Sequence, residues 1–296
     1  MVRCRPKALI GTIKCSALII EGQSVSRLSF HIEVVRAADT GLELLETTLE
    51  EVQPDIAVIS PDELEIVHDI GKGAQGETSL CIWKSAAGDR RVAVKRLAAG
   101  ITNSPSVQSF DDLEREAAIL YLLGHHPHIV KFWGICRRGD RGDETVQVVT
   151  KYEEGGNIQD KLALYGNGHN GRNGRGVHGS GHEIDTHVRI RWARQLASAL
   201  ANVHAANVVH NDVACRNALL SREGANGDAV LCDFGVSRLL RWGGLEIVSL
   251  LEPEGRDFER NLPLRQMPNE ALNPPYAFSP KSDAWMFGMM LYEVRS

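Results

Sequence analysis

A glycine-rich stretch at residues 71–76 (GKGAQG) has the spacing G-x-G-x-x-G. Glycines let backbone N–H groups approach phosphate oxygens with no side chain in the way. A dinucleotide-binding turn of this spacing must lead into a helix. Residues 77–83 (ETSLCIW) instead alternate like a strand. The stretch therefore predicts a hairpin that closes over a nucleotide.

A lysine ends the apolar run 92–95 (VAVK), which predicts a strand. The stem of Lys95 would be partly buried there, so its ammonium needs a partner. We expect that partner to be Glu116, in a helix over residues 109–123, with Glu114 as the competing choice. Glu116 is favoured because the apolar residues that follow it place it on the apolar side of the helix.

Two further motifs carry groups that suit a hard metal ion and a phosphate. They are residues 210–217 (HNDVACRN) and residues 233–235 (DFG). Mg²⁺ prefers oxygen ligands, which carboxylates and an amide supply. Phosphoryl transfer depends mostly on positioning and charge neutralisation, so these side chains and a lysine suffice for it.

The four motifs, in this order and at these spacings, resemble the catalytic domain of a eukaryotic protein kinase of the tyrosine-kinase-like group. The resemblance covers the chain from about residue 64 to its C-terminus. It implies an α+β fold with two lobes, a five-stranded sheet with one helix followed by a mainly helical lobe. It also implies ATP as co-substrate, Mg²⁺ as cofactor and a protein as the phosphate acceptor.

The resemblance gives roles to individual residues. Asp212 would accept the proton of the substrate hydroxyl, and Asn217 and Asp233 would hold Mg²⁺. Lys95 and Glu116 would orient the ATP phosphates, and Arg216 belongs to the same catalytic group. The implied ATP pocket consists of Ile70, Gly71, Gly73, Gly76, Thr78, Ala93, Lys95, Thr150, Tyr152, Asp160 and Leu219.

Within that pocket Thr150 stands at the gatekeeper position, and Lys151 and Tyr152 would form the hinge. Asp160 would contact the ribose. Thr78 replaces the usual valine and adds a hydroxyl over the base, which predicts weaker nucleotide binding.

The segment 210–217, which by the resemblance would be the catalytic loop and is so called below, also bears on which hydroxyl is phosphorylated. Serine/threonine kinases usually place a lysine two residues after the catalytic aspartate, where this chain has Ala214. Arg216, four residues after Asp212, instead resembles the tyrosine kinases. The resemblance therefore implies tyrosine specificity, with a serine/threonine kinase as a weaker alternative.

Three departures favour a different class of function, a pseudokinase-like scaffold or binding module without turnover: the expected absence of the last helices of the family fold, Asn211 and Asn269. Asn211 stands where the family has an arginine that pairs with a phosphorylated residue. Asn269 lies in P-N-E, where the family has A-P-E. Residues 233–270 also contain no tyrosine. We expect that tyrosine autophosphorylation in this segment does not control the chain.

The elements that must position these residues can be read from the apolar pattern. Strands are expected at 64–71, 77–84, 91–97, 129–136 and 145–152, and helices at 187–205 and 282–294. These define an N-lobe over about 63–150, a hinge over 151–155 and a partial C-lobe over 156–296. Residues 165–182, rich in Gly, Asn, His and Arg, predict a flexible insert.

Residues 1–62 are expected to be an extension of unknown function. Apolar runs at 8–20 and 28–35 could be strands, and residues 40–52 resemble a short helix. At the other end, the last helices of the kinase fold are expected to be absent after Ser296. The apolar side chains of 285–292 would then lack cover, which predicts a partner over the incomplete C-lobe.

Composition excludes several classes of protein. The 296 residues hold 33 Lys+Arg and 38 Asp+Glu, a net charge of −5, which gives no electrostatic footprint for nucleic acid. The six cysteines form no C-x-x-C pair, so neither a zinc ribbon nor a redox dithiol is indicated. We expect reduced thiols, a cytoplasmic location and no transmembrane segment in this chain.

Overall fold

The structure is a computed structural model, and the chain divides into two compact units, Met1–Ile56 and Ala57–Ser296. The described residues are 11–21, 24–34, 50–52, 56–73, 76–97, 110–138, 145–166, 184–224, 226–240, 249–250, 266–272 and 277–295.

The first unit contains an antiparallel sheet of strands β1 (Gly11–Glu21), β2 (Ser24–Val34) and β3 (Glu50–Val52), in that order. The two expected apolar strands correspond to β1 and β2. The helix expected over 40–52 is wrong for residues 50–52, because they pair with β2, with Arg27 opposite Val52. A strand partner outweighs local propensity here. Residues 40–49 lie outside the described residues.

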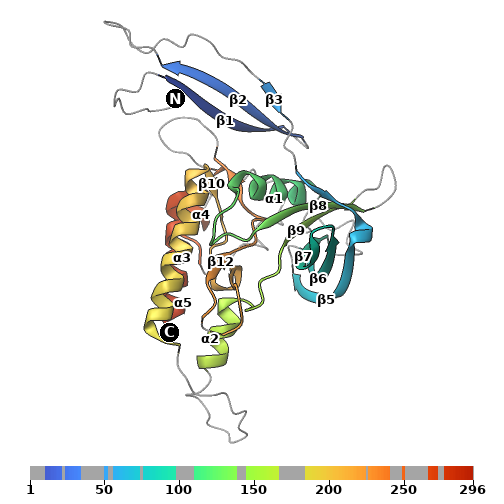
Figure 1. Cartoon of the computed structure of the whole chain (residues 1–296). Coiled ribbons are helices and arrows are strands. Elements are labelled where there is room, and N and C mark those ends of the chain that lie inside the picture. Colours follow the sequence, from blue (N-terminus) through green and yellow to red (C-terminus); the bar gives the residue numbers. More distant parts are fainter. Residues whose placement is uncertain are drawn as a thin grey trace, which may run out of the picture. The chain divides into compact units, whose positions relative to one another are not determined.

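The second unit begins with a six-stranded sheet in the order β4-β8-β9-β7-β6-β5 (Figure 1). Its strands are β4 (Val58–Ile59), β5 (Leu64–Gly73), β6 (Gly76–Ser85), β7 (Gly88–Arg96), β8 (Phe132–Arg138) and β9 (Thr145–Lys151). The five expected strands are present and pair antiparallel. The sixth, β4, pairs parallel with β8.

One helix, α1 (Phe110–Leu123), packs against β8 and β9 (Figure 1). Leu113, Ala117 and Leu120 are buried at intervals of three or four residues, as expected for one face of a helix. Glu116 is buried with them, at 4% exposure. The helix therefore carries a carboxylate into the protein on its apolar side.

The rest of the unit is mainly helical, with short strand pairs between the helices. The helices are α2 (Ile158–Gly166), α3 (Thr186–Ala205), α4 (Asn269–Leu272) and α5 (Pro280–Arg295). A 3₁₀ turn, η2 (Cys215–Asn217), lies between them. The strand pairs are β10 (Val208–Val209) with β13 (Arg238–Leu239), β11 (Ala218–Leu220) with β12 (Ala229–Leu231), and β14 (Ser249–Leu250) with β15 (Ala277–Phe278).

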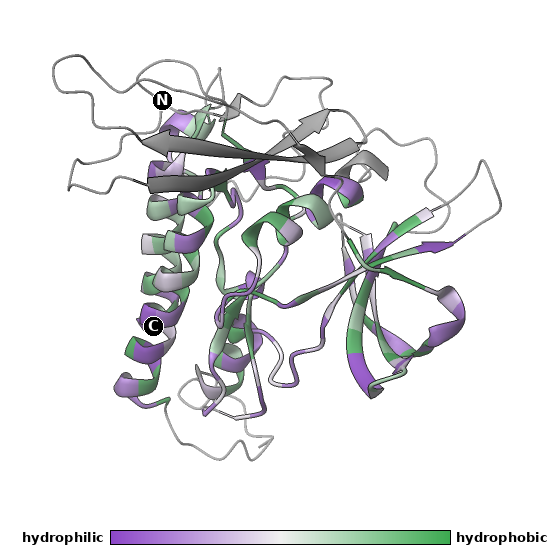
Figure 2. Ribbon diagram, turned by 45° about the horizontal axis from the view of Figure 1, so that its top comes forward, coloured by the Kyte–Doolittle hydropathy of each residue, from purple (hydrophilic) through white to green (hydrophobic). Residues whose placement is uncertain are grey.

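Figure 2 shows hydrophobic and hydrophilic residues alternating along the long helices of this part. α3 begins at Asp185, whose carboxylate accepts a hydrogen bond from the His187 N–H at 2.6 Å. Its Trp192 is fully buried and donates to the carbonyl of Gly227 at 2.9 Å. The α3 face thus anchors the loop before β12.

Helix α5 packs against α3 and against η2. Met286 and Met290 are fully buried, whereas Trp285 and Tyr292 are 56% and 69% exposed. The expectation that the apolar side chains of 285–292 lack cover is therefore wrong for the two methionines, because they face these contacts.

The insert expected at 165–182 can be followed only at its start, where Tyr165 and Gly166 end α2. Residues 167–182 lie outside the described residues. In the part of the chain that the structure describes, no helix has the length and apolarity needed to cross a bilayer.

Candidate active site

A cleft of about 650 Å³ lies between the sheet and the mainly helical part of the second unit. The sheet and the hinge after β9 supply one side, and the segments around β11 and β12 supply the other. The predicted ATP-pocket residues that line it are Ile70, Gly71, Gly76, Thr78, Ala93, Lys95, Thr150, Tyr152, Asp160 and Leu219. Gly73, the remaining one, ends β5 opposite Gly76.

Lys95 joins three distant parts of the chain at the inner end of this cleft. Its Nζ, from β7, lies 2.8 Å from Oε2 of Glu116 on α1 and 2.8 Å from Oδ1 of Asp233 after β12. Glu116 rather than Glu114 occupies this place, since Glu114 lies near Arg137, at 3.7 Å. The cluster fixes the ammonium where it faces the cleft.

Charge in this cluster is stabilised by its own members. Burial opposes the positive charge on Lys95, but the carboxylates of Asp233 and Glu116 outweigh it and raise the pKa of the ammonium. Burial likewise opposes the charge on Asp233, and the Lys95 ammonium outweighs it, so the pKa of that carboxyl is lowered. Lys95 and Asp233 are therefore both charged at neutral pH.

Asp212 lies in the loop before η2 and is held by both of its nearest polar neighbours. Nδ2 of Asn217 donates to Asp212 Oδ2 at 2.7 Å and to its main-chain carbonyl at 2.8 Å. Arg216 forms an ion pair with Oδ1 of the same carboxylate. Burial raises the pKa of Asp212 despite the Arg216 charge. A buried carboxylate with a raised pKa is suited to accept a proton.

Asn217 and Asp233 fit the donor set of a hard cation. The amide nitrogen of Asn217 is used on Asp212, so its remaining polar atom is a carbonyl oxygen. Asp233 adds a carboxylate that is 26% exposed, and both residues line the cleft. Amide and carboxylate oxygens are ligands that Mg²⁺ prefers.

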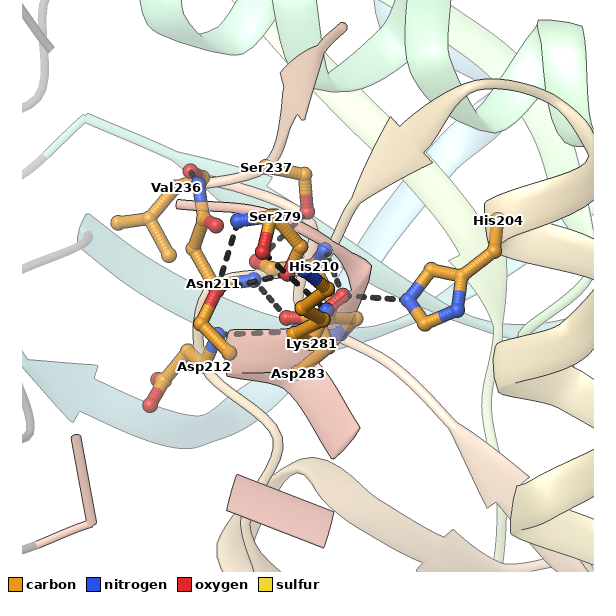
Figure 3. A network of polar contacts seen from close by, with 10 residues as sticks. His204, His210, Asn211, Asp212, Val236, Ser237, Ser279, Lys281 and Asp283 are labelled. Carbon is orange, nitrogen blue, oxygen red and sulfur yellow. Dashed lines mark hydrogen bonds and ion pairs between the residues drawn. The ribbon is translucent and has the colours of Figure 1, made fainter. Parts of the chain in front are cut away.

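The buried Asp283 of α5 fixes the backbone of the catalytic loop (Figure 3). Its Oδ2 accepts from the N–H of His210 at 2.8 Å, and its Oδ1 accepts from the N–H of Asn211 at 2.9 Å. Nε2 of His204 lies 2.9 Å from the same carboxylate. In Figure 3 the carboxylate of Asp212 points away from this network. The network therefore orients the backbone of the loop, and the carboxylate of Asp212 lies on the side away from it.

Asn211 ties this loop to the segment that follows residues 233–235. It has φ +66°, a left-handed conformation that asparagine tolerates better than most residues. Its Nδ2 donates to the carbonyl of Val236 at 3.0 Å, and Ser237 Oγ donates to the carbonyl of His210 at 3.0 Å. Uncharged hydrogen bonds therefore connect the two segments at this point.

Phe234, at 1% exposure, packs against the ring of His210, with the two centroids 4.8 Å apart. Nε2 of His210 also lies 3.1 Å from the carbonyl of Cys232. Asp233 itself has φ +63°. Both chain neighbours of Asp233 thus contact His210, and the carboxylate of Asp233 pairs with Lys95.

Some lining residues were not predicted from the sequence, namely Leu120, Val130, Val148, Glu153 and Asn157. The three apolar ones form part of α1, β9 and the segment before β8, where the sequence shows only core-like periodicity. Asn157 donates to Oδ2 of Asp160 at 2.8 Å, which orients the predicted ribose contact. Glu153 is 5% exposed and pairs with Lys151 at 2.9 Å. A buried glutamate needs such a partner, because an unpaired one would be costly. Neither the burial nor its place in the cleft can be read from the sequence.

A sheet with one packed helix, followed by a mainly helical part and a cleft of this kind, is the fold of the protein kinases. The chain belongs to the protein tyrosine and serine/threonine kinase family, whose model matches residues 64–296.

Individual relatives are tyrosine kinases and a growth factor receptor. The chain is 31% identical to the human NT-3 growth factor receptor, over 82% of this chain and 28% of the receptor. It is 26% identical to the tyrosine-protein kinase Abl of Drosophila melanogaster, over 82% of this chain and 12% of that protein. It is 27% identical to human tyrosine-protein kinase FRK, over 80% of this chain and 39% of that kinase. The chain therefore spans well under half the length of these relatives.

Proposed function

We propose that this chain binds ATP with Mg²⁺ in the cleft and transfers the γ-phosphoryl group to a tyrosine hydroxyl of a protein. The observation that carries the proposal is the ion-paired Lys95, 2.8 Å from both Glu116 and Asp233, in one cleft with Asn217. These are the groups that phosphoryl transfer requires, and they come from separate parts of the chain.

The steps assigned to the chain follow from the positions of its side chains. Lys95 would contact the α- and β-phosphates, and residues 71–76 would cover the triphosphate. Asp212 would take the proton of the attacking hydroxyl. The hydroxyl oxygen would bond to the γ-phosphorus while the bond between that phosphorus and the ADP oxygen breaks. Mg²⁺, held by Asn217 and Asp233, would neutralise charge on the phosphate oxygens. Arg216 would keep the Asp212 carboxylate in place through their ion pair.

Adenine and ribose would occupy the outer part of the cleft. Ile70, Thr78, Ala93 and Leu219 line it, with Thr150 at the start of the hinge that Lys151 and Tyr152 continue. Asp160 would contact the ribose. Gly73 would act as part of the glycine-rich stretch.

Tyrosine specificity is supported by the catalytic loop and by the names of the relatives. Ala214 replaces the lysine of serine/threonine kinases, and Arg216 stands at the tyrosine-kinase position. Abl and FRK are named tyrosine-protein kinases. Since Abl and FRK are only 26% and 27% identical to this chain, transfer to serine or threonine is kept as the weaker alternative.

A second candidate is a scaffold that binds ATP without turnover, and Asn211 and Asn269 favour it. We further propose that residues 63–296 are the kinase domain and residues 1–62 an extension. We also propose a partner that covers α5 at Trp285 and Tyr292. A cytoplasmic location is a further proposal.

One assay separates the three possibilities. The full chain is given labelled ATP and Mg²⁺ with either poly(Glu,Tyr) or casein, and Asp212→Ala is the control. Transfer to poly(Glu,Tyr) that the variant abolishes supports the proposal, and transfer to casein alone supports serine/threonine specificity. Thermal stabilisation by ATP with Mg²⁺, in the absence of any transfer, would select the scaffold.

A further inference from the structure

Residues 57–63, which we call the strap, lie outside the part of the chain that matches the family model, residues 64–296. They are nevertheless built into the sheet. The N–H of Ile135 donates to the carbonyl of Ala57 at 2.9 Å, and β4 continues the parallel pairing, with Ile59 opposite Cys136. After β4, the strap ends in the 3₁₀ turn η1 (Pro61–Glu63).

Gly134 of β8 makes room for the strap. It has φ +151°, a conformation that side-chain-bearing residues rarely adopt. A Cβ added at Gly134 would lie 2.2 Å from the carbonyl oxygen of Ala57 and 3.0 Å from its carbonyl carbon. Real contacts are never that short, so any larger residue at 134 would displace the strap.

The two residues of β4 are buried very differently. Ile59 is 2% exposed, and its neighbour Val58 is 65% exposed. Ile59 belongs to a core cluster on one face of the sheet that includes Val92 and Val94. The strap also contacts the edge of this cluster, because Nε1 of Trp83 donates to Glu63 at 3.1 Å. Ile59 therefore fills the core behind the sheet.

That core lies directly behind the residues of the cleft. Side chains alternate between the faces of a strand. Along β7, Val92 and Val94 belong to the cluster with Ile59, whereas Ala93 and Lys95 line the cleft. We infer that the strap is a positioning element for the proposed kinase site, in which Ile59 supports β7 from behind and so holds Lys95 in place. This inference rests on the proposed function for its effect on ATP.

The test uses three variants of the full chain. Ile59→Ala removes the buried side chain, Val58→Ala is the matched exposed control, and Ile59→Val restores most of the volume. We expect Ile59→Ala to lower the melting temperature by about 5–10 °C and Val58→Ala to leave it unchanged. At 10 °C, well below unfolding, we expect Ile59→Ala to weaken binding of a fluorescent ATP analogue about 3–10-fold. Ile59→Val should restore it.

The affinity measurement separates positioning from mere stability. If Ile59→Ala melts earlier but binds the analogue with wild-type affinity, the strap is only structural and the inference is overturned. A wild-type chain that does not bind the analogue would overturn the proposed function instead. The positioning role of the strap is then tested by amide hydrogen exchange over residues 92–95, a measurement that needs no nucleotide.

In that exchange experiment Ile59→Ala should speed exchange over 92–95 more than over α3, and Val58→Ala should not. Gly134→Ala should reproduce the effect by displacing the strap. Gly224→Ala is its control, since Gly224 also has a positive φ, +79°, but open space around it. Equal exchange over 92–95 in Gly134→Ala and Gly224→Ala would overturn the inference. If Ile59→Ala does not fold, Gly134→Ala is judged by the same criteria against Gly224→Ala.

Discussion

Nζ of Lys95 lies 2.8 Å from Oδ1 of Asp233, so a residue of the sheet and a residue that follows β12 share one ion pair. Glu116 completes the cluster from α1. The pKa of Lys95 is raised by these carboxylates and that of Asp233 is lowered by Lys95. The ion pair therefore persists below the ordinary aspartate pKa of about 3.9 and above the ordinary lysine pKa of about 10.4.

Lys95→Met should destabilise the protein because it leaves the buried carboxylate of Glu116 and the partly buried carboxylate of Asp233 without their cation. Losing one partner of a buried pair costs about 3–5 kcal/mol. We expect this loss near pH 8 and a smaller one near pH 5, where the unpaired carboxyls can take up protons. Urea unfolding at the two pH values measures it. Lys84→Met, which breaks an exposed pair with Glu65, is the control and should change little. A loss that does not depend on pH would contradict the cluster as described.

Asp212→Asn should slow catalysis strongly while stabilising the protein at neutral pH. Burial raises the pKa of Asp212, so the folded state favours its protonated form, and this contribution is lost as the pH rises through the raised pKa. A neutral amide avoids that cost. Melting temperatures should show the variant above the wild type at pH 7.5 and the difference shrinking toward pH 4. A variant less stable than the wild type at pH 7.5 would argue against a raised pKa.

The same shift predicts the acid side of the pH–rate profile. Because a general base must be deprotonated, kcat/KM should fall as the pH drops through a value above the ordinary aspartate pKa of about 3.9. A profile measured from below the ordinary aspartate pKa up to pH 8 tests this. A profile that stays flat down to that ordinary value would contradict a raised pKa of Asp212.

Asn211→Ala should loosen the connection between the catalytic loop and Val236. The lost hydrogen bond is worth about 0.5–1.5 kcal/mol, and alanine at φ +66° adds a backbone cost. Asn207→Ala is the control, because Asn207 is exposed and has φ +57°. Unfolding free energies should be lower for Asn211→Ala than for Asn207→Ala. Equal values would mean that the Val236 contact contributes nothing.

The uncharged connection at Asn211 also bears on regulation. With no cation at this position and no tyrosine in residues 233–270, we expect phosphatase treatment to leave the activity of the purified chain unchanged. Mass spectrometry of the chain before and after incubation with ATP is the companion measurement. An activating phosphosite within 233–270, for example on Ser249, would contradict this prediction.

The sequence predicted the residues whose chemistry is fixed by motif spacing. Lys95, Asp212, Asn217 and Asp233 follow from short, ordered patterns, and the apolar side of α1 was enough to favour Glu116 over Glu114. The same periodicity gave the five main strands, because each is long enough to show alternation.

What the sequence could not give depends on contacts between distant residues. β4 has only two residues, so it shows no period, and Gly134 looks like any other glycine until Ala57 is placed beside it. The burial of Met286 and Met290 follows from the packing of α5 on α3. Glu153 and Asn157 carry no motif and were identified only by their place in the cleft.

The role of Asp212 is best tested by measuring transfer from labelled ATP beside ATP binding in the same preparations. The wild-type chain should bind ATP with Mg²⁺ and phosphorylate poly(Glu,Tyr). Asp212→Asn should bind ATP comparably and transfer about 10²–10⁴-fold more slowly. Equal transfer by the two proteins, or binding that persists unchanged when Lys95 and Asp233 are both replaced, would contradict the site described above.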